Sequence, residues 1–112
     1  MEIEARQVEG VLVISVAGSI DALTAEEFSG FLSELVDQGQ HQFVMDLARL
    51  DFMSSAGLRG ILHLLRDSRQ QGGNLRLAAV QPGVTRVLEL AGLPRIMDLY
   101  PAVDDAIASF ST

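Results

Sequence analysis

Apolar residues along the chain follow two periodicities, which predict strands separated by helices. Residues 11–17 are nearly all apolar and rich in β-branched side chains, as expected for a strand covered on both faces. Residues 2–7 alternate polar and apolar positions and predict an edge strand, joined to the first by a turn at Glu9–Gly10. Three further short apolar runs predict strands at residues 43–47, 75–80 and 96–100.

The first helix is expected to follow Thr24, because a threonine there can cap it and Glu27 stands three residues on, as in a capping box. Leu23 and Phe28 have the spacing of a hydrophobic staple across this helix start. Gly39 is a suitable end, since glycine readily adopts the left-handed backbone that closes a helix.

Three more helices are predicted by apolar residues at helical spacing. One begins at the serines of residues 54–55, carries its apolar repeat from Leu58 on, and runs to about residue 70. One begins at Pro82 and ends at Gly92, and the last begins at Pro101. The resulting order is strand-strand-helix-strand-helix-strand-helix-strand-helix. We therefore expect an α/β fold, with a mixed, mostly parallel sheet of about five strands and about four helices, in one domain spanning residues 1–112.

Charge and composition narrow the possible functions. The net charge of −7 makes nucleic acid and anionic membrane surfaces poor partners, and a basic protein a better one. All eight cationic residues are arginine and cysteine is absent, so lysine chemistry, thiol nucleophiles and thiolate metal sites are excluded. The charged amino terminus does not resemble a signal peptide, and no apolar run could span a membrane, so a cytoplasmic protein is expected.

The candidate site is formed by two loops that follow the first two central strands. Carboxyl ends of parallel strands meet at one edge of a sheet, so Asp21 should lie beside Ser54 and Ser55 if these strands are adjacent. One serine could simply cap the next helix. However, a cap needs only one hydroxyl, and a helix start can also hold a phosphate. Gly57 and Gly60 are expected to leave a bare helix surface that a partner protein could approach.

Catalysis by a serine nucleophile is not supported, because it needs a base. His63 is two turns along the helix from Ser55, and His41 precedes a strand and should lie at the opposite rim. Asp21, Asp46 and Asp51 could suggest phosphoryl transfer, but the matching lysine is missing, and Asp51 is expected to be a turn residue. No cluster has metal-ligand spacing. We expect neither enzymatic activity, nor a cofactor, nor a metal.

Four segments of the sequence, in register, resemble one known family. The run LDFMSSAGLRGIL resembles the signature of STAS-domain anti-sigma factor antagonists, and GSIDALTAEEF, PGVTRVLELAGL and AVDDAIASF resemble other parts of those proteins in the same order. Together they cover almost the whole chain. The resemblance implies a STAS-like fold.

The resemblance also implies a function and its residues. Such proteins bind an anti-sigma factor that is also a serine kinase, and so release a sigma factor; phosphorylation ends the binding and a serine phosphatase restores it. The family pattern places the phosphorylated serine at Ser55, with Ser54 as the alternative, since many members carry aspartate at the position of Ser54. Asp21 falls on the family's early-loop aspartate. The partner-binding residues implied or expected are Asp21, Ser54, Gly57, Leu58 and Gly60.

A different class of function remains open from the sequence. STAS-like domains also act as interaction or sensory modules of larger signalling assemblies and of anion transporters. An enzyme or nucleotide-binding domain is a third possibility, which the absence of a base, a lysine and a glycine-rich phosphate loop disfavours.

Overall fold

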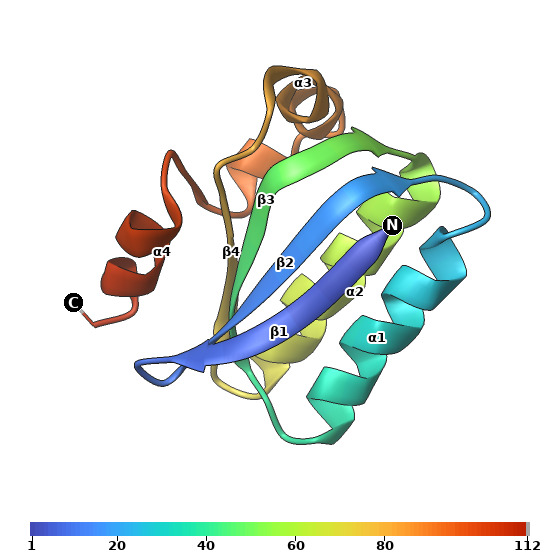
Figure 1. Cartoon of the computed structure of the whole chain (residues 1–112). Coiled ribbons are helices and arrows are strands. Elements are labelled where there is room, and N and C mark those ends of the chain that lie inside the picture. Colours follow the sequence, from blue (N-terminus) through green and yellow to red (C-terminus); the bar gives the residue numbers. More distant parts are fainter. Residues whose placement is uncertain (112) are drawn as a thin grey trace.

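The computed structural model describes residues 1–111 and contains a five-stranded mixed sheet whose strands lie in sequence order (Figure 1). Strand β1 (Glu2–Val8) runs antiparallel to β2 (Val11–Ile20). Strands β3 (Gln42–Met53), β4 (Asn74–Ala78) and β5 (Leu99–Tyr100) follow, each parallel to its neighbour. The predicted mixed, mostly parallel sheet is confirmed.

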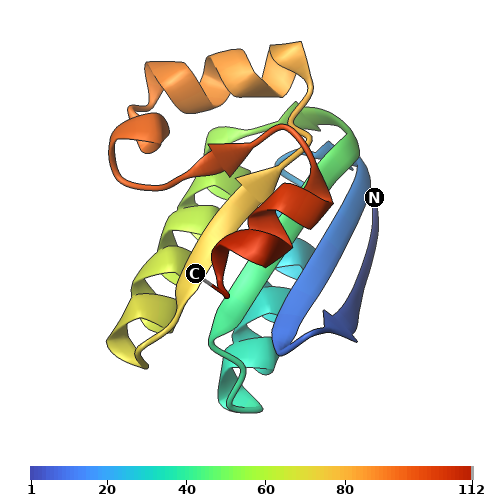
Figure 2. The ribbon, with the colours of Figure 1, turned by 90° about the vertical axis from the view of Figure 1, so that its left-hand side faces the viewer.

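The helices cover the two faces of the sheet unequally. They are α1 (Ala25–Asp37), α2 (Ser55–Gln70), α3 (Pro82–Leu90), the 3₁₀ turn η1 (Leu93–Arg95) and α4 (Val103–Ser109). Strands β2 to β5 advance in one direction across the sheet, so right-handed crossovers place the connecting helices on one face. Figure 2 shows α4 alone in front of the sheet and α1 and α2 behind it, and in Figure 1 the strands lie between α4, on the left, and α1, on the right.

Two apolar clusters separate these layers. The larger one joins the sheet to α1, α2 and α3 and includes Ile14, Phe28 and Ile61, all fully buried. The smaller one lies under α4, where the Arg76 guanidinium also stacks on the Phe110 ring, 4.1 Å from its centroid. Among residues 1–111, no helix combines the length and the apolar composition that a membrane crossing requires.

Several elements differ from their predicted limits. Strand β2 continues to Ile20, so residues 18–20, expected in a loop, belong to the sheet, and β4 ends at Ala78, two residues before its predicted end. Strand β3 continues to Met53, well beyond the predicted end at residue 47, so Asp51 lies in a strand and not in a turn. Its ladder with β2 persists through two register shifts, which the local sequence does not reveal. The strand predicted at residues 96–100 is reduced to two residues, and the last helix begins at Val103, two residues after Pro101.

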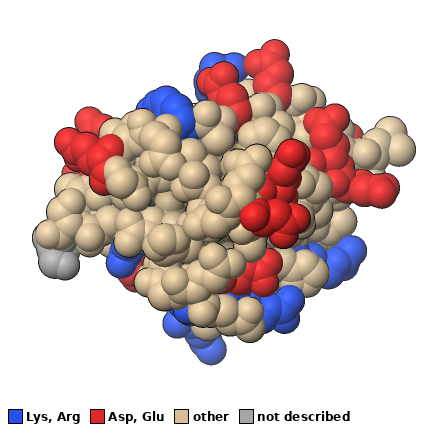
Figure 3. All heavy atoms as spheres, turned by 90° about the horizontal axis from the view of Figure 1, so that it is seen from below, with Lys and Arg blue, Asp and Glu red and all other residues tan. Residues whose placement is uncertain are grey.

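Surface charge is divided between the two halves of the chain. Ten of the fifteen carboxylates, but only two of the eight arginines, precede residue 59. Figure 3 shows acidic groups on the right, in the centre and at the upper left of the view, with basic groups along its lower margin and near its top. The division therefore holds along the sequence, and on this face the two kinds of charge are interspersed.

The glycines near the start of α2 are buried, so the bare surface expected at Gly57 and Gly60 is wrong. A Cβ on Gly57 would lie 2.8 Å from Ile20 Cγ2 and 3.0 Å from Met53 Cγ. A Cβ on Gly60 would lie 3.1 Å from the Phe28 ring. These glycines let α2 approach β2 and α1 closely, and they are covered by those elements instead of forming an open surface.

We predict that Gly57→Ala lowers the free energy of unfolding by about 1–2 kcal/mol, because the added methyl group must displace packed side chains. Urea denaturation measures this change. The matched control is Gly30→Ala on α1, where no atom lies within 4 Å of the added Cβ. There the better helix propensity of alanine should raise stability by about 0.5–1 kcal/mol. Equal effects at the two positions would contradict the packing role of Gly57.

Candidate functional site

The carboxyl ends of β2 and β3 bring the two predicted loops together. Ile20 and Met53 are paired at the ends of the two parallel strands, and the Ser54 amide donates a hydrogen bond to the Ile20 carbonyl at 2.8 Å. Asp21 and Ser54 are the residues that follow this pair. The expectation that Asp21 and the two serines share one rim is confirmed.

The two serines have different environments. Ser54 is the N-cap of α2 and is half-buried, with extended backbone (φ −80°, ψ 169°), and its Oγ accepts a hydrogen bond from the Gly57 amide at 3.3 Å. Ser55 is the first residue of the helix and is exposed. Its hydroxyl makes no hydrogen bond within residues 1–111. One hydroxyl therefore serves the fold, and the other is available for chemistry.

Asp21 organises the loop that precedes α1. Its Oδ1 accepts hydrogen bonds from the Leu23 and Thr24 amides, each at 2.9 Å, and lies 3.1 Å from the Thr24 hydroxyl. The Asp21 amide in turn donates to Thr24 Oγ1 at 2.9 Å, and the Ala25 amide donates to the Asp21 carbonyl. Asp21 thus fixes the shape of the turn at the rim.

These contacts correct the predicted start of α1. Thr24 occupies the N-cap position but makes no side-chain capping bond, because its hydroxyl is engaged with Asp21 and the Ser19 carbonyl. The predicted staple is also wrong, since Leu23 is 90% exposed while Phe28 is fully buried. The carboxylate of Asp21 binds the amides of Leu23 and Thr24, just before the helix, whereas the predicted Thr24 cap would bind an amide of the first helical turn.

Hydrogen bonds to the carboxylate lower the pKa of Asp21 below the ordinary value of an aspartate. The amide and then the hydroxyl of Thr24 are the main causes, and partial desolvation opposes them weakly. A lowered pKa means that the ionised carboxylate stabilises the folded loop above the pKa of a free aspartate. That stabilisation is lost as the pH falls through the lowered value.

An exposed aromatic residue also lies at this rim and was missed in the sequence. Phe52 pairs with Ser19 across β2 and β3, and the residue is 51% exposed beside the exposed Asp51. A phenylalanine beside a methionine, as at Phe52 and Met53, is normally assigned to the core, so nothing in the local pattern marked Phe52 as exposed. Its position adds apolar contact area next to the serines.

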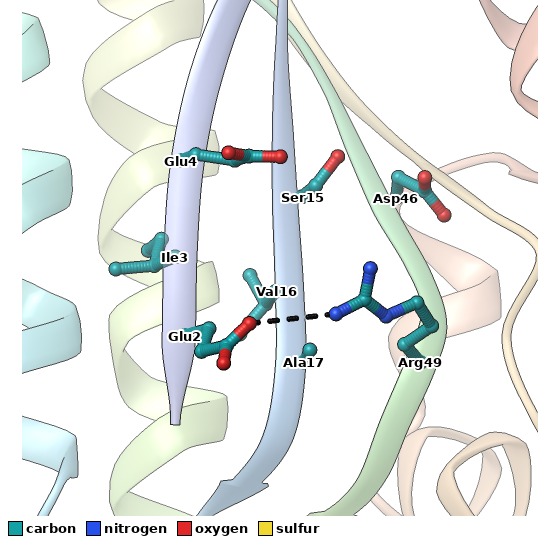
Figure 4. A pocket seen from close by; sticks show the side chains of 8 residues that line it. All are labelled: Glu2, Ile3, Glu4, Ser15, Val16, Ala17, Asp46 and Arg49. Carbon is teal, nitrogen blue, oxygen red and sulfur yellow. Dashed lines mark hydrogen bonds and ion pairs between the residues drawn. The ribbon is translucent and has the colours of Figure 1, made fainter.

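A hollow lies away from this rim, on the face of the sheet that α4 leaves open (Figure 4). It has a volume of about 160 Å³, and its polar lining includes Glu4, Ser15 and Asp46. Arg49 Nη2 reaches across β2 to Glu2 Oε2 at 3.4 Å, but both side chains are at least 75% exposed, so the ion pair contributes little to stability. The hollow is separate from the serines and is a shallow, solvated surface.

The histidines lie where the sequence placed them. His41 precedes β3 at the opposite end of the sheet, and its Nδ1 lies 3.3 Å from the Gly39 carbonyl. His63 is eight residues along α2 from Ser55, or roughly 12 Å of helix rise. Neither can activate a serine at this rim. Within residues 1–111, no group of three histidine, aspartate or glutamate residues is arranged to hold a metal ion.

We predict that Ser54→Ala lowers the free energy of unfolding by about 1 kcal/mol, because the Gly57 amide loses its capping acceptor. Ser55→Ala removes a hydroxyl with no partner and should change stability by less than about 0.5 kcal/mol. Thermal and urea denaturation of the two variants compare the hydroxyls directly. A larger loss from Ser55→Ala than from Ser54→Ala would contradict this assignment of the cap.

We also predict that the Leu23 and Thr24 amide signals titrate by NMR with a midpoint lower than the ordinary pKa of an aspartate, because both amides bind the Asp21 carboxylate. Thr24→Val removes the hydroxyl but keeps the amide, so the midpoint should rise without reaching the ordinary value. Thr85→Val, whose hydroxyl faces the Val80 carbonyl instead, is the control and should leave the midpoint unchanged. An ordinary midpoint in the unmodified protein would refute the proposed turn.

Comparison with known proteins identifies relatives along most of the chain. The family model described as the STAS domain matches residues 2–106. The chain is 34% identical over 112 residues to BtrV of Bordetella bronchiseptica, which carries the name of an anti-sigma factor antagonist; the match covers 100% of this chain and 97% of that protein. It is 33% identical over 101 residues to the anti-sigma F factor antagonist of Paenibacillus polymyxa, covering 89% and 86% of the two chains.

Solved structures agree with these sequence relationships. An anti-sigma factor antagonist from Mycobacterium paratuberculosis superposes with a TM-score of 0.91 at 28% identity, covering 99% of this chain and 94% of the other. The unphosphorylated form of the antagonist SpoIIAA superposes with a TM-score of 0.86 at 22% identity, covering 98% and 96%, which shows a shared fold. The chain belongs to the STAS-domain family of anti-sigma factor antagonists.

Proposed function

We propose that this chain is a regulatory protein that binds an anti-sigma factor, frees the sigma factor held by it, and is switched off by phosphorylation of Ser55. The observation that carries the proposal is the exposed, unbonded Ser55 hydroxyl at the start of α2, on the same rim as Asp21. The names of the relatives at 33–34% identity support the class of partner.

Ser55 fits a phosphorylation site better than Ser54 for steric and energetic reasons. A kinase must reach the hydroxyl oxygen, and Ser55 is exposed whereas Ser54 is half-buried. Phosphorylation of Ser54 would also alter the oxygen that caps the Gly57 amide. At Ser55, a phosphate would meet the positive end of the dipole of α2 without displacing an existing bond.

The expected effect of the phosphate is local. It brings about −1.5 to −2 charges at pH 7 to a rim that already holds Asp21 and Asp51. A partner surface that is complementary to these carboxylates and to the exposed Phe52 would then meet added bulk and a strongly hydrated group. Binding is lost while the fold, which does not involve the Ser55 hydroxyl, remains.

Direct partner contacts are assigned to Asp21, Ser54 and Ser55, together with Phe52. Leu58, only 9% exposed, and the buried Gly57 and Gly60 contribute by fixing the position of α2. The proposed partners are an anti-sigma factor that is a serine kinase and a serine phosphatase. The chain is proposed to act without catalysis, as one domain, in the cytoplasm, and without contact with nucleic acid or membrane.

The test uses the anti-sigma factor kinase recovered from the source cell by its binding to the purified chain. We predict that Ser55→Ala still binds the kinase but takes up no phosphate, and that Ser55→Asp binds at least about tenfold more weakly because of the added charge. Phosphosite mapping by mass spectrometry and calorimetric titration measure the two effects. Ser54→Ala is the control and should still be phosphorylated. Phosphate on Ser55→Ala after kinase treatment would show that the site is misassigned.

A further inference from the structure

A groove on the side of α2 away from α1 has no role in the function proposed above. It has a volume of about 520 Å³ and is lined by Leu62, Leu65, Arg66, Arg69, Gln70 and Ile96. Apolar groups form its floor, and Ile96 is 46% exposed there although it is a large hydrophobic residue. No carboxylate lines the groove. Its occupant should therefore be apolar and acidic.

The two arginines of the groove differ in how they are held. Arg69 donates from Nε to Asn74 Oδ1 at 3.1 Å and from Nη2 to the Ile96 carbonyl at 2.6 Å, so it is tied to the wall. Arg66 is exposed and makes no hydrogen bond or ion pair within residues 1–111. Its guanidinium is free to bind a carboxylate from outside, in a chain that is otherwise strongly acidic.

A segment with the required chemistry occurs in this chain. Leu23, at 90% exposure, is the most exposed of the four exposed large hydrophobic residues in the described part of the chain. It directly precedes the first turn of α1, where Glu26 and Glu27 are both exposed. This apolar side chain beside two carboxylates matches the groove, with its apolar floor and its free arginine. We call residues 23–27 the acidic knob.

We propose that the groove binds the acidic knob of a second copy of this chain. Leu23 would lie against Leu62 and Ile96, and the glutamates would face Arg66. The two surfaces are different and lie on different helices, so the contact is head-to-tail, and each copy keeps one free groove and one free knob. The proposal does not depend on the phosphorylation of Ser55.

Charge favours this occupant over random contacts between copies. Two molecules of net charge −7 repel at long range, but screening at about 0.1 M salt limits that repulsion to roughly 10 Å. At short range, the exposed Glu26 and Glu27 of one copy would meet the exposed Arg66 of the next, in a groove whose lining contains no carboxylate. The contact is small, so we expect a weak association, with a dissociation constant on the order of 100 µM.

Sedimentation velocity of the full chain over a concentration series tests the proposal. The expected result is a weight-average sedimentation coefficient that rises with concentration up to about 1 mM. Leu23→Gln and Arg66→Glu should each weaken the association at least about tenfold. The matched controls are Leu90→Gln and Arg86→Glu on α3, exposed residues of the same types outside both surfaces, and they should associate like the unmodified chain.

Mixing the two variants distinguishes a head-to-tail contact from a symmetric one. Leu23→Gln keeps an intact groove and Arg66→Glu keeps an intact knob, so a mixture can form one good contact per pair. We expect the mixture to form a 1:1 complex that does not grow further, at concentrations of a few hundred µM where each variant alone associates at least about tenfold more weakly than the unmodified chain. A chain that stays monomeric up to about 1 mM overturns the proposal, and leaves the groove to an acidic segment of another protein. Association that neither variant weakens, or that mixing does not restore, also overturns it.

Discussion

The pairing of the carboxyl ends of β2 and β3 is the constraint on which the rest of this structure depends. Ile20 and Met53 sit side by side in the parallel ladder, and the Ser54 amide closes it by donating to the Ile20 carbonyl. Gly57 then lets α2 pack directly onto these two side chains. The loops that follow the two strands therefore lie at one rim of the sheet. The hydrogen bond of the Ser54 amide also fixes the position of Ser55, the next residue.

Periodicity and connectivity made the fold predictable. Each predicted strand and helix follows from a burial pattern that repeats over many residues. Because the two central strands were expected to be parallel neighbours, Asp21 and the two serines were then expected at the same edge of the sheet. The start of α1 was mispredicted because a capping-box pattern cannot show that Asp21 and the Ser19 carbonyl compete for the Thr24 hydroxyl. Local rules state which bonds are possible, and the tertiary fold selects among them.

Other features could not be inferred from neighbouring residues at all. Glycine lowers helix propensity whether its missing side chain faces solvent or another element, so the sequence could not show that Gly57 and Gly60 face the core. The length of β3 depends on a partner strand some thirty residues away. The exposure of Phe52 and Ile96 likewise depends on which parts of the surface the other elements leave uncovered. These are properties of packing between distant segments.

The Asp21 turn connects the surfaces that we propose for this molecule. Its carboxylate holds the amides of Leu23 and Thr24, so one ionised group fixes both the rim beside Ser55 and the backbone at the base of the acidic knob. A protein bound over Asp21 must therefore cover the base of the acidic knob, which lies only two residues away. Binding a partner at the rim and binding a second copy would then exclude one another. The same short turn would thus make self-association a competitor of the partner for the chain whose Ser55 is unphosphorylated, which is the form that binds the partner.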